Sequence, residues 1–155
     1  MAEVIFLIGP PCSGKSTWIK NEADGEFTIC STDDLISWYG EKYNRSYNDV
    51  FNSGITRAFE SIFKQSIKDL TADNKNIIID RTNTTVSTRE KILSLIPENY
   101  KKTAVYFDVG IDTLLERNKV RSETGKHIPA FVIKNFKNKM EIPTLEEFDE
   151  IIKVE

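Results

Sequence analysis

Five short runs of apolar residues recur along the 155-residue chain and alternate with longer stretches of helical spacing. The runs are Val4–Ile8, Phe27–Cys30, Ile77–Ile79, Ala104–Phe107 and Ile151–Val154. Near-continuous hydrophobicity over such short runs, here three to five residues, is typical of parallel strands that are buried on both faces. The alternation therefore predicts an α/β fold, with a five-stranded parallel sheet and helices on both of its faces.

The segments between these runs predict the helices. We expect them over Lys15–Glu22, Asp49–Leu70, Ser87–Ile96, Asp112–Arg121 and Pro129–Met140. The longest is expected to bury one apolar face, formed by Phe51, Ile55, Phe59, Ile62, Phe63 and Ile67. Ser87 and Glu90 have the spacing of a capping box. In such folds ligands bind beyond the carboxyl ends of the strands, so chemistry is expected there.

Length and charge narrow the class of protein. The length fits a single domain over residues 1–155. No apolar run approaches the roughly 20 residues that a membrane span needs, and Val4–Ile8 is expected to be a strand rather than a signal peptide. A cytoplasmic protein with reduced Cys12 and Cys30 is therefore expected. The net charge of −3 argues mildly against a dedicated nucleic-acid binder, although residues 117–139 carry seven basic side chains against one acid.

One motif carries a specific chemistry. Residues 9–16, Gly-Pro-Pro-Cys-Ser-Gly-Lys-Ser, fit the P-loop pattern at every defined position, between a predicted strand and a predicted helix. Backbone N–H groups of such a loop bind polyphosphate, Lys15 places a cation on the β- and γ-phosphates, and the Ser16 hydroxyl ligates Mg²⁺. We expect ATP or another nucleoside triphosphate to bind at Gly9, Pro10, Pro11, Cys12, Ser13, Gly14, Lys15, Ser16 and Thr17.

Carboxylates follow two of the other strands. Asp33 and Asp34 come after Phe27–Cys30, where one of them could accept a proton from an alcohol while the other caps a helix. We assign Asp33 as the base and Asp34 as the cap. Asp80 ends the run Ile77–Ile79 and is expected to organise the Mg²⁺ shell, as in a Walker B element.

Further polar groups extend this edge. Arg81, Thr82 and Asn83 follow Asp80, and substrate contact and a structural turn remain equally open for Thr82 and Asn83. Arg117 and Arg121 lie four apart on a predicted helix and suit a phosphoryl group, so residues 117–128 are expected to form a lid. Lys126 and Arg81 are the cations expected to contact the acceptor. Among the aromatic residues, Trp38, Tyr39 and Tyr43 follow Asp33 closely enough to be candidates for stacking on a base, and core packing is expected for at least one of them.

This constellation resembles the kinase domain of phage and DNA-repair polynucleotide 5′-hydroxyl kinases. The matching pieces are residues 9–18, Thr32-Asp33-Asp34, Asp80–Asn83, and Phe107-Asp108-Val109 leading to Arg117–Arg121. The resemblance implies a P-loop kinase fold with a helical lid, Lys15 and Ser16 as phosphate and magnesium ligands, Asp33 as general base, and Arg117 and Arg121 on the donor phosphates. It also implies a 5′-hydroxyl end of DNA or RNA as substrate.

The sequence departs from that family at two points, Ile36 and the segment Arg81-Thr82-Asn83, where the phage enzyme has Asp-Thr-Asn. Ile36 stands where the phage enzyme has an arginine for the acceptor strand, so we expect a grip on only the first one or two nucleotides. The Asp-x-Asp-Gly-Thr motif of the phosphatase half is absent, so no phosphatase domain is expected. Two alternatives remain: a kinase of a small molecule, mononucleotide or hydroxymethylated base, and a non-catalytic nucleotide-binding module, which would not need Asp33.

Overall fold

All five expected strands are present in the computed structural model, which describes residues 1–124 and 128–155. The strands are β1 (Glu3–Ile8), β2 (Phe27–Cys30), β3 (Asn76–Ile79), β4 (Lys101–Phe107) and β5 (Glu150–Val154). They form one parallel sheet in the order β2-β3-β1-β4-β5. Because β1 pairs with both β3 and β4, the segments that follow these three strands meet at one edge of the sheet.

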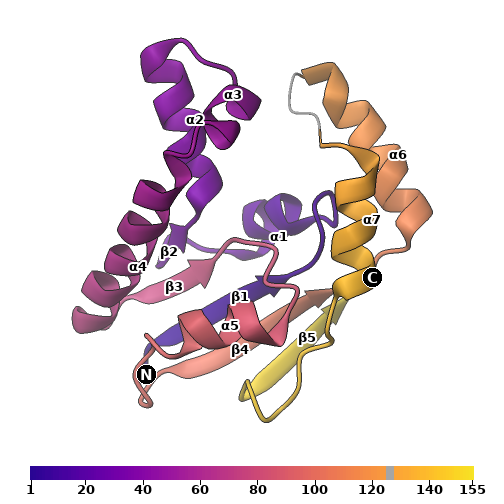
Figure 1. Ribbon diagram of the computed structural model, residues 1–155. Helices are drawn as coiled ribbons and strands as arrows, with labels where there is room; N and C mark the ends of the chain where they lie inside the picture. Colours follow the sequence, from indigo (N-terminus) through magenta and orange to yellow (C-terminus); the bar gives the residue numbers. More distant parts are fainter. Residues whose placement is uncertain (125–127) are drawn as a thin grey trace.

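Helices follow each strand except the last and pack on both faces of the sheet (Figure 1). They are α1 (Lys15–Glu22), α2 (Thr32–Tyr43), α3 (Tyr47–Asn52), α4 (Thr56–Ala72), α5 (Val86–Leu93), α6 (Ile111–Arg121) and α7 (Ala130–Lys139), with a 3₁₀ turn at Ser122–Thr124. The α/β fold predicted from the sequence is confirmed. Within the described ranges, none of these helices is long and apolar enough to span a bilayer.

Alternation along β1 explains why both faces are covered. Val4, Phe6 and Ile8 are fully buried in a cluster with side chains of α4 and α5. The intervening Ile5 and Leu7 lie in a second cluster, which Trp18 and Ile19 of α1 cover from the opposite face. Burying one such side chain contributes about 1.5–3 kcal/mol relative to leaving it in water. The central strand is therefore held from both sides, and the P-loop begins directly at its end.

The expected long helix over Asp49–Leu70 is wrong. Two helices, α3 and α4, replace it, because Gly54 adopts the left-handed conformation at φ 84° and the chain turns there. After the break, Val50 of α3 still packs with Phe59 of α4, but Phe51 does not continue the buried face. Phe51 is consequently 54% exposed, whereas Phe59 and Phe63 on α4 are buried as expected.

Two expected helix caps are also wrong. The N-cap of α5 is Thr85, whose side chain accepts a hydrogen bond from the N–H of Thr88, so Ser87 and Glu90 form no capping box. Helix α2 begins at Thr32 after Ser31, which places Asp33 and Asp34 together in its first turn. Asp34 is therefore not the cap. Both carboxylates still lie where the helix dipole favours negative charge.

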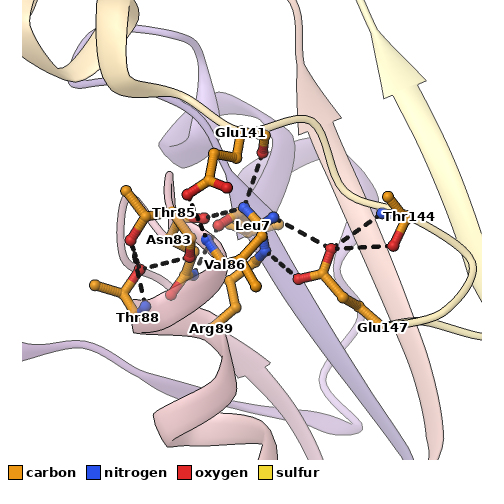
Figure 2. Close-up of polar contacts among 9 residues, drawn as sticks. All are labelled: Leu7, Asn83, Thr85, Val86, Thr88, Arg89, Glu141, Thr144 and Glu147. Carbon is orange, nitrogen blue, oxygen red and sulfur yellow. Dashed lines mark hydrogen bonds and ion pairs between the residues drawn. The ribbon is translucent and has the colours of Figure 1, made fainter.

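A fully buried arginine, Arg89 on α5, joins three distant parts of the chain (Figure 2). Its guanidinium donates to both carboxylate oxygens of Glu147, at 2.7 and 3.2 Å, and to the carbonyls of Asn83 and Glu141, at 2.9 and 3.0 Å. The Asn83 amide in turn donates to the Leu7 carbonyl at 2.8 Å. The turn after β3 is thereby tied to β1 and to the segment that leads into β5.

The same contacts lower the pKa of the partner carboxylate, Glu147. Burial alone raises the pKa of Glu147, but hydrogen bonds from Arg89 and Thr144 and the charge of Arg89 outweigh burial and hold the pKa below its ordinary value. The carboxylate therefore stays ionised at neutral pH, as a buried guanidinium requires of its partner.

Glu147→Gln should lower the free energy of unfolding by about 3 kcal/mol, because removing one charge of a buried pair leaves the other uncompensated. The matched control is Glu146→Gln at the exposed neighbouring position, where a change within about 0.5 kcal/mol is expected. Urea denaturation at pH 7 measures both values. Equal stabilities of the two variants would contradict a structural role for the Arg89–Glu147 pair.

Candidate active site

An open cleft of about 1180 Å³ lies beyond the carboxyl ends of the strands. The P-loop and the start of α1 form its floor, and the turn after β3 contributes Asp80, Arg81 and Thr82. One wall comes from the starts of α2 and α3, and the other from α6 and α7, which stand on opposite sides in Figure 1. We call these walls the acceptor wall (α2 and α3) and the donor wall (α6 and α7).

Two glycines allow the P-loop its shape. Gly14, which precedes α1, has φ 103°, a conformation that residues with a side chain rarely adopt. A Cβ atom on Gly9 would lie 2.4 Å from Ser13 Oγ and 3.0 Å from Phe107 Cβ, so no larger residue fits there. Ser13 Oγ is itself buried and has no hydrogen-bond partner within the described residues. A hydroxyl buried in this loop without a partner is suited to a phosphate oxygen.

Lys15 lies among the groups expected to surround a triphosphate. Its ammonium donates to the carbonyls of Gly9 and Pro10 at 2.7 and 2.8 Å. Burial lowers the pKa of Lys15 to about 8, against the opposing charges of Asp80 and Asp33. The two carboxylates are thus close enough to act on Lys15, and all three residues line one cleft.

The two arginines of α6 reach the P-loop from the donor wall. Arg117 Nη1 donates to the Cys12 carbonyl at 3.1 Å, and Arg121 Nη1 lies 3.3 Å from Cys12 Sγ. They share a face, as their spacing indicates, and converge on the same loop residue. The turn 122–124 follows them. Lys126 and the rest of the segment 125–127 lie outside the described residues.

On the acceptor wall, Asp33 is held by a neighbouring helix. The Tyr47 hydroxyl donates to Asp33 Oδ1 at 2.6 Å, and both residues line the cleft. Burial, the hydrogen bond and the charge of Asp33 all raise the pKa of Tyr47. The phenol therefore remains protonated and keeps donating to the carboxylate over the neutral pH range.

The turn after β3 divides its residues between the cleft and the core. Asp80, Arg81 and Thr82 line the cleft, and the Thr82 carbonyl accepts a hydrogen bond from the Gly9 N–H at 2.9 Å. Arg81 pairs with Glu60 at 3.0 Å and lies 4.7 Å above the Phe63 ring. Asn83 is only 3% exposed and does not line the cleft, so its amide serves the turn itself.

The donor atoms suit a magnesium ion that arrives with a nucleotide. Across residues 1–124 and 128–155, no group of three or more His, Cys, Asp or Glu side chains forms a metal site. Ser16 and Asp80 both line the cleft and offer one hydroxyl and one carboxylate. Mg²⁺ typically binds through one or two such ligands together with substrate phosphates and water.

The aromatic residues of the acceptor wall differ from those expected. Trp38, Tyr39 and Tyr43 do not line the cleft; Tyr39 packs on Phe59, and Lys42 lies over the Trp38 ring. Tyr47 and Phe51 on α3 line it instead. The sequence does hold a signal for this short helix, because Ser46 is a residue type that favours the N-cap position. In the structure its side chain accepts a hydrogen bond from the N–H of Asp49.

Comparisons with known proteins agree with this geometry. The model of one protein family, described as an AAA domain, matches residues 4–143. A bifunctional polynucleotide phosphatase/kinase of Schizosaccharomyces pombe is 23% identical over 148 residues, which are 94% of this chain and 31% of that protein. This chain thus spans about a third of that relative's length.

Solved structures share the fold at low identity. A chain of the Pnkp1/Rnl/Hen1 RNA repair complex superposes with a TM-score of 0.74 and 22% identity, over 89% of this chain and 43% of that chain. A gluconokinase from Sinorhizobium meliloti gives a TM-score of 0.58 and 16% identity, over 98% and 81% of the two chains. The fold is therefore that of P-loop kinases, which act on different acceptors.

The affinity for MgATP should fall as the pH rises through about 8, the pKa of Lys15 in the free protein. Phosphates bind the protonated lysine, so affinity should be constant well below this pH and drop by up to about tenfold per pH unit above it. Titration calorimetry between pH 6.5 and 9.5 measures this dependence. Lys15→Arg is the control, because its guanidinium stays charged and should flatten the profile even if binding weakens. An identical slope in both proteins would exclude Lys15 as its source.

Proposed function

Because this chain belongs to the AAA domain family, we propose that it is an ATP-dependent kinase that phosphorylates the 5′-hydroxyl end of DNA or RNA. The observation that carries this proposal is the placement of Asp33 in one cleft with the P-loop, close enough for its charge to act on Lys15. A protein that only bound or hydrolysed a nucleotide would not need a carboxylate opposite the phosphates on a separate wall.

The donor wall supplies the positive charge that phosphoryl transfer needs. In this proposal the P-loop N–H groups and Lys15 hold the β- and γ-phosphates, while Arg117 and Arg121 bind the transferred group and its leaving oxygen. Both arginines already contact Cys12 of the P-loop, so they need little movement to reach a phosphate there. Residues 117–128 then act as the lid.

The acceptor wall supplies the base. Asp33 accepts the proton of the 5′-hydroxyl while the hydroxyl oxygen forms a bond to the γ-phosphorus of ATP. The bond between the γ-phosphorus and the bridging oxygen of the β-phosphate breaks, and ADP leaves. Tyr47 orients the carboxylate through its hydrogen bond to Oδ1. Ser16 and Asp80 would hold the magnesium ion, which neutralises charge on the phosphates when bound.

Two comparisons support a polynucleotide as the acceptor. The Schizosaccharomyces pombe relative is named a polynucleotide phosphatase/kinase, and the solved RNA repair complex contains a chain with the same fold. The match covers 31% of that relative's length. Ile36 is buried against Val50 and Phe59, so the position of the missing strand-binding arginine belongs to the core. We therefore propose that the protein contacts only the first one or two nucleotides of the acceptor, through Arg81 and Lys126.

A small-molecule acceptor is the second candidate. It is favoured by the paucity of cations on the acceptor wall: among the described residues that line the cleft, Lys15, Arg117 and Arg121 serve the donor side, and Arg81 is paired with Glu60. The fold shared with a gluconokinase is compatible with it. The identity of the molecule that is phosphorylated distinguishes the polynucleotide kinase from the small-molecule kinase.

Incubation with labelled ATP should transfer phosphate to 5′-hydroxyl oligonucleotides in preference to gluconate, mononucleotides and hydroxymethylated bases. With one or two phosphate contacts, log K against log[salt] should have a slope of about −0.7 to −1.4, and kcat/KM should level off after a few nucleotides. Labelling of a small molecule alone would refute the polynucleotide assignment.

Asp33→Asn should lower kcat by roughly 10²–10⁴-fold and leave ATP binding nearly unchanged, because only proton acceptance is lost. Asp34→Asn is the matched control on the same helical turn and should be far milder. Steady-state kinetics with the best oligonucleotide from the panel measures both. A larger loss in Asp34→Asn would exchange the two roles.

Arg117→Lys and Arg121→Lys should each remain well below wild-type kcat, because an ammonium cannot reproduce the planar fork on a phosphoryl group. The alanine variants should lose on the order of 10³-fold. Lys119→Ala, on the same helix but absent from the cleft lining, should be close to wild type. If both lysine variants kept full activity, the arginines would be surface charges.

A further inference from the structure

Helix α3 turns four side chains toward the cleft, and the proposed chemistry gives only one of them, Tyr47, a role. They are Tyr47, Asn48, Phe51 and Asn52. Phe51 is the apolar member, and its ring is 54% exposed. The exposed ring lies on the wall that also holds Asp33.

The two rings of α3 form one continuous surface. Tyr47 and Phe51 are four residues apart, with ring centroids separated by 6.2 Å and planes only 16° apart. The Tyr47 hydroxyl fixes this surface to Asp33 at 2.6 Å. A substrate whose hydroxyl reaches Asp33 therefore has two nearly parallel aromatic rings beside its reacting atom.

A small side pocket continues the same surface. It has a volume of about 130 Å³ and is bounded by Phe51 and Phe59 on its apolar side and by Glu60 and Arg81 on its polar side. Asp33 borders both this pocket and the main cleft. The combination of flat rings and an edge that donates and accepts hydrogen bonds matches the two surfaces of a nucleobase.

The charges exclude a strongly anionic group at this position. Asp33 and Asp34 are both on this wall, and Arg81 already pairs with Glu60 and stacks on Phe63. A carboxylate or phosphate placed here would meet two acids and a cation that is already neutralised. A neutral ring meets no such penalty.

We infer that Tyr47 and Phe51 form a base-binding subsite, which stacks the base of the nucleoside that carries the reacting 5′-hydroxyl. This inference rests on the proposed function and adds to it how the acceptor is recognised. The terminal nucleoside is held by its uncharged base on α3, in addition to the one or two phosphate contacts of the proposed function. Tyr47 has a second task as a positioning residue, because the same side chain orients Asp33.

Phe51→Ala should raise the KM for a 5′-hydroxyl dinucleotide about tenfold, within the range that one base–aromatic stack supplies, and leave the KM for ATP unchanged. Phe131→Ala is the matched control, since Phe131 on α7 is 73% exposed and does not line the cleft. It should match wild type. Phe51→Leu keeps the apolar character without the flat ring and should lose most of the same affinity.

A 5′-terminal abasic acceptor tests the stack directly. Wild type should bind it about tenfold less well than the base-bearing acceptor. Phe51→Ala should bind both acceptors alike, because the stacking energy requires the Phe51 ring and the base at the same time. Tyr47→Phe should lower kcat about tenfold with little change in either KM, because it keeps the ring and loses only the orientation of Asp33.

The outcomes separate the two levels of the argument. If wild type phosphorylates oligonucleotides but Phe51→Ala loses equally on base-bearing and abasic acceptors, or behaves like Phe131→Ala, the base-binding subsite is refuted and the proposed function stands. If wild type phosphorylates no oligonucleotide, both are refuted.

Discussion

The buried charge of Arg89 constrains the edge of the sheet where the cleft lies. A guanidinium without contact to water needs hydrogen-bond acceptors around it, and each of the three nitrogens of Arg89 donates to Glu147 or to the carbonyls of Asn83 and Glu141. Since Asn83 also grips the Leu7 carbonyl and Thr82 accepts from Gly9, the P-loop and the turn carrying Asp80 cannot shift independently. Residues far from any phosphate thus set the relative position of groups that would touch one.

The strand order explains why the two walls can be built separately. The P-loop leaves the central strand β1, the base follows the edge strand β2, and the arginines follow β4, with β3 between β1 and β2. Lys15, Arg117 and Arg121 gather on the donor side, and Asp33 with the aromatic rings of α3 lies on the other. In the proposed reaction, changes in α2 and α3 would therefore alter the acceptor site and leave the nucleotide site unchanged.

The parts predicted well from the sequence were those encoded locally. Five apolar runs gave all the strands, and the P-loop spacing placed Lys15 and Ser16 in the cleft. Arg117 and Arg121 share a face because four residues make about one helical turn. The acceptor wall was predicted poorly, because Gly54 broke a helix that periodicity had extended through it. The Arg89 network was not foreseen either, since its partners are 6 to 58 residues away in the chain and no local pattern reports them.

The position of β1 in the sheet has a consequence for dynamics. A strand hydrogen-bonded on both sides and covered on both faces opens only with the whole fold, so its amides should exchange last with solvent. Helices α2 and α3 instead lie beyond β2, a four-residue strand with a neighbour on one side only. Local opening there costs less free energy than opening at the centre. In the proposed reaction, the acceptor would thus enter beside the edge that opens more easily, while the nucleotide would stay on the P-loop that follows the central strand.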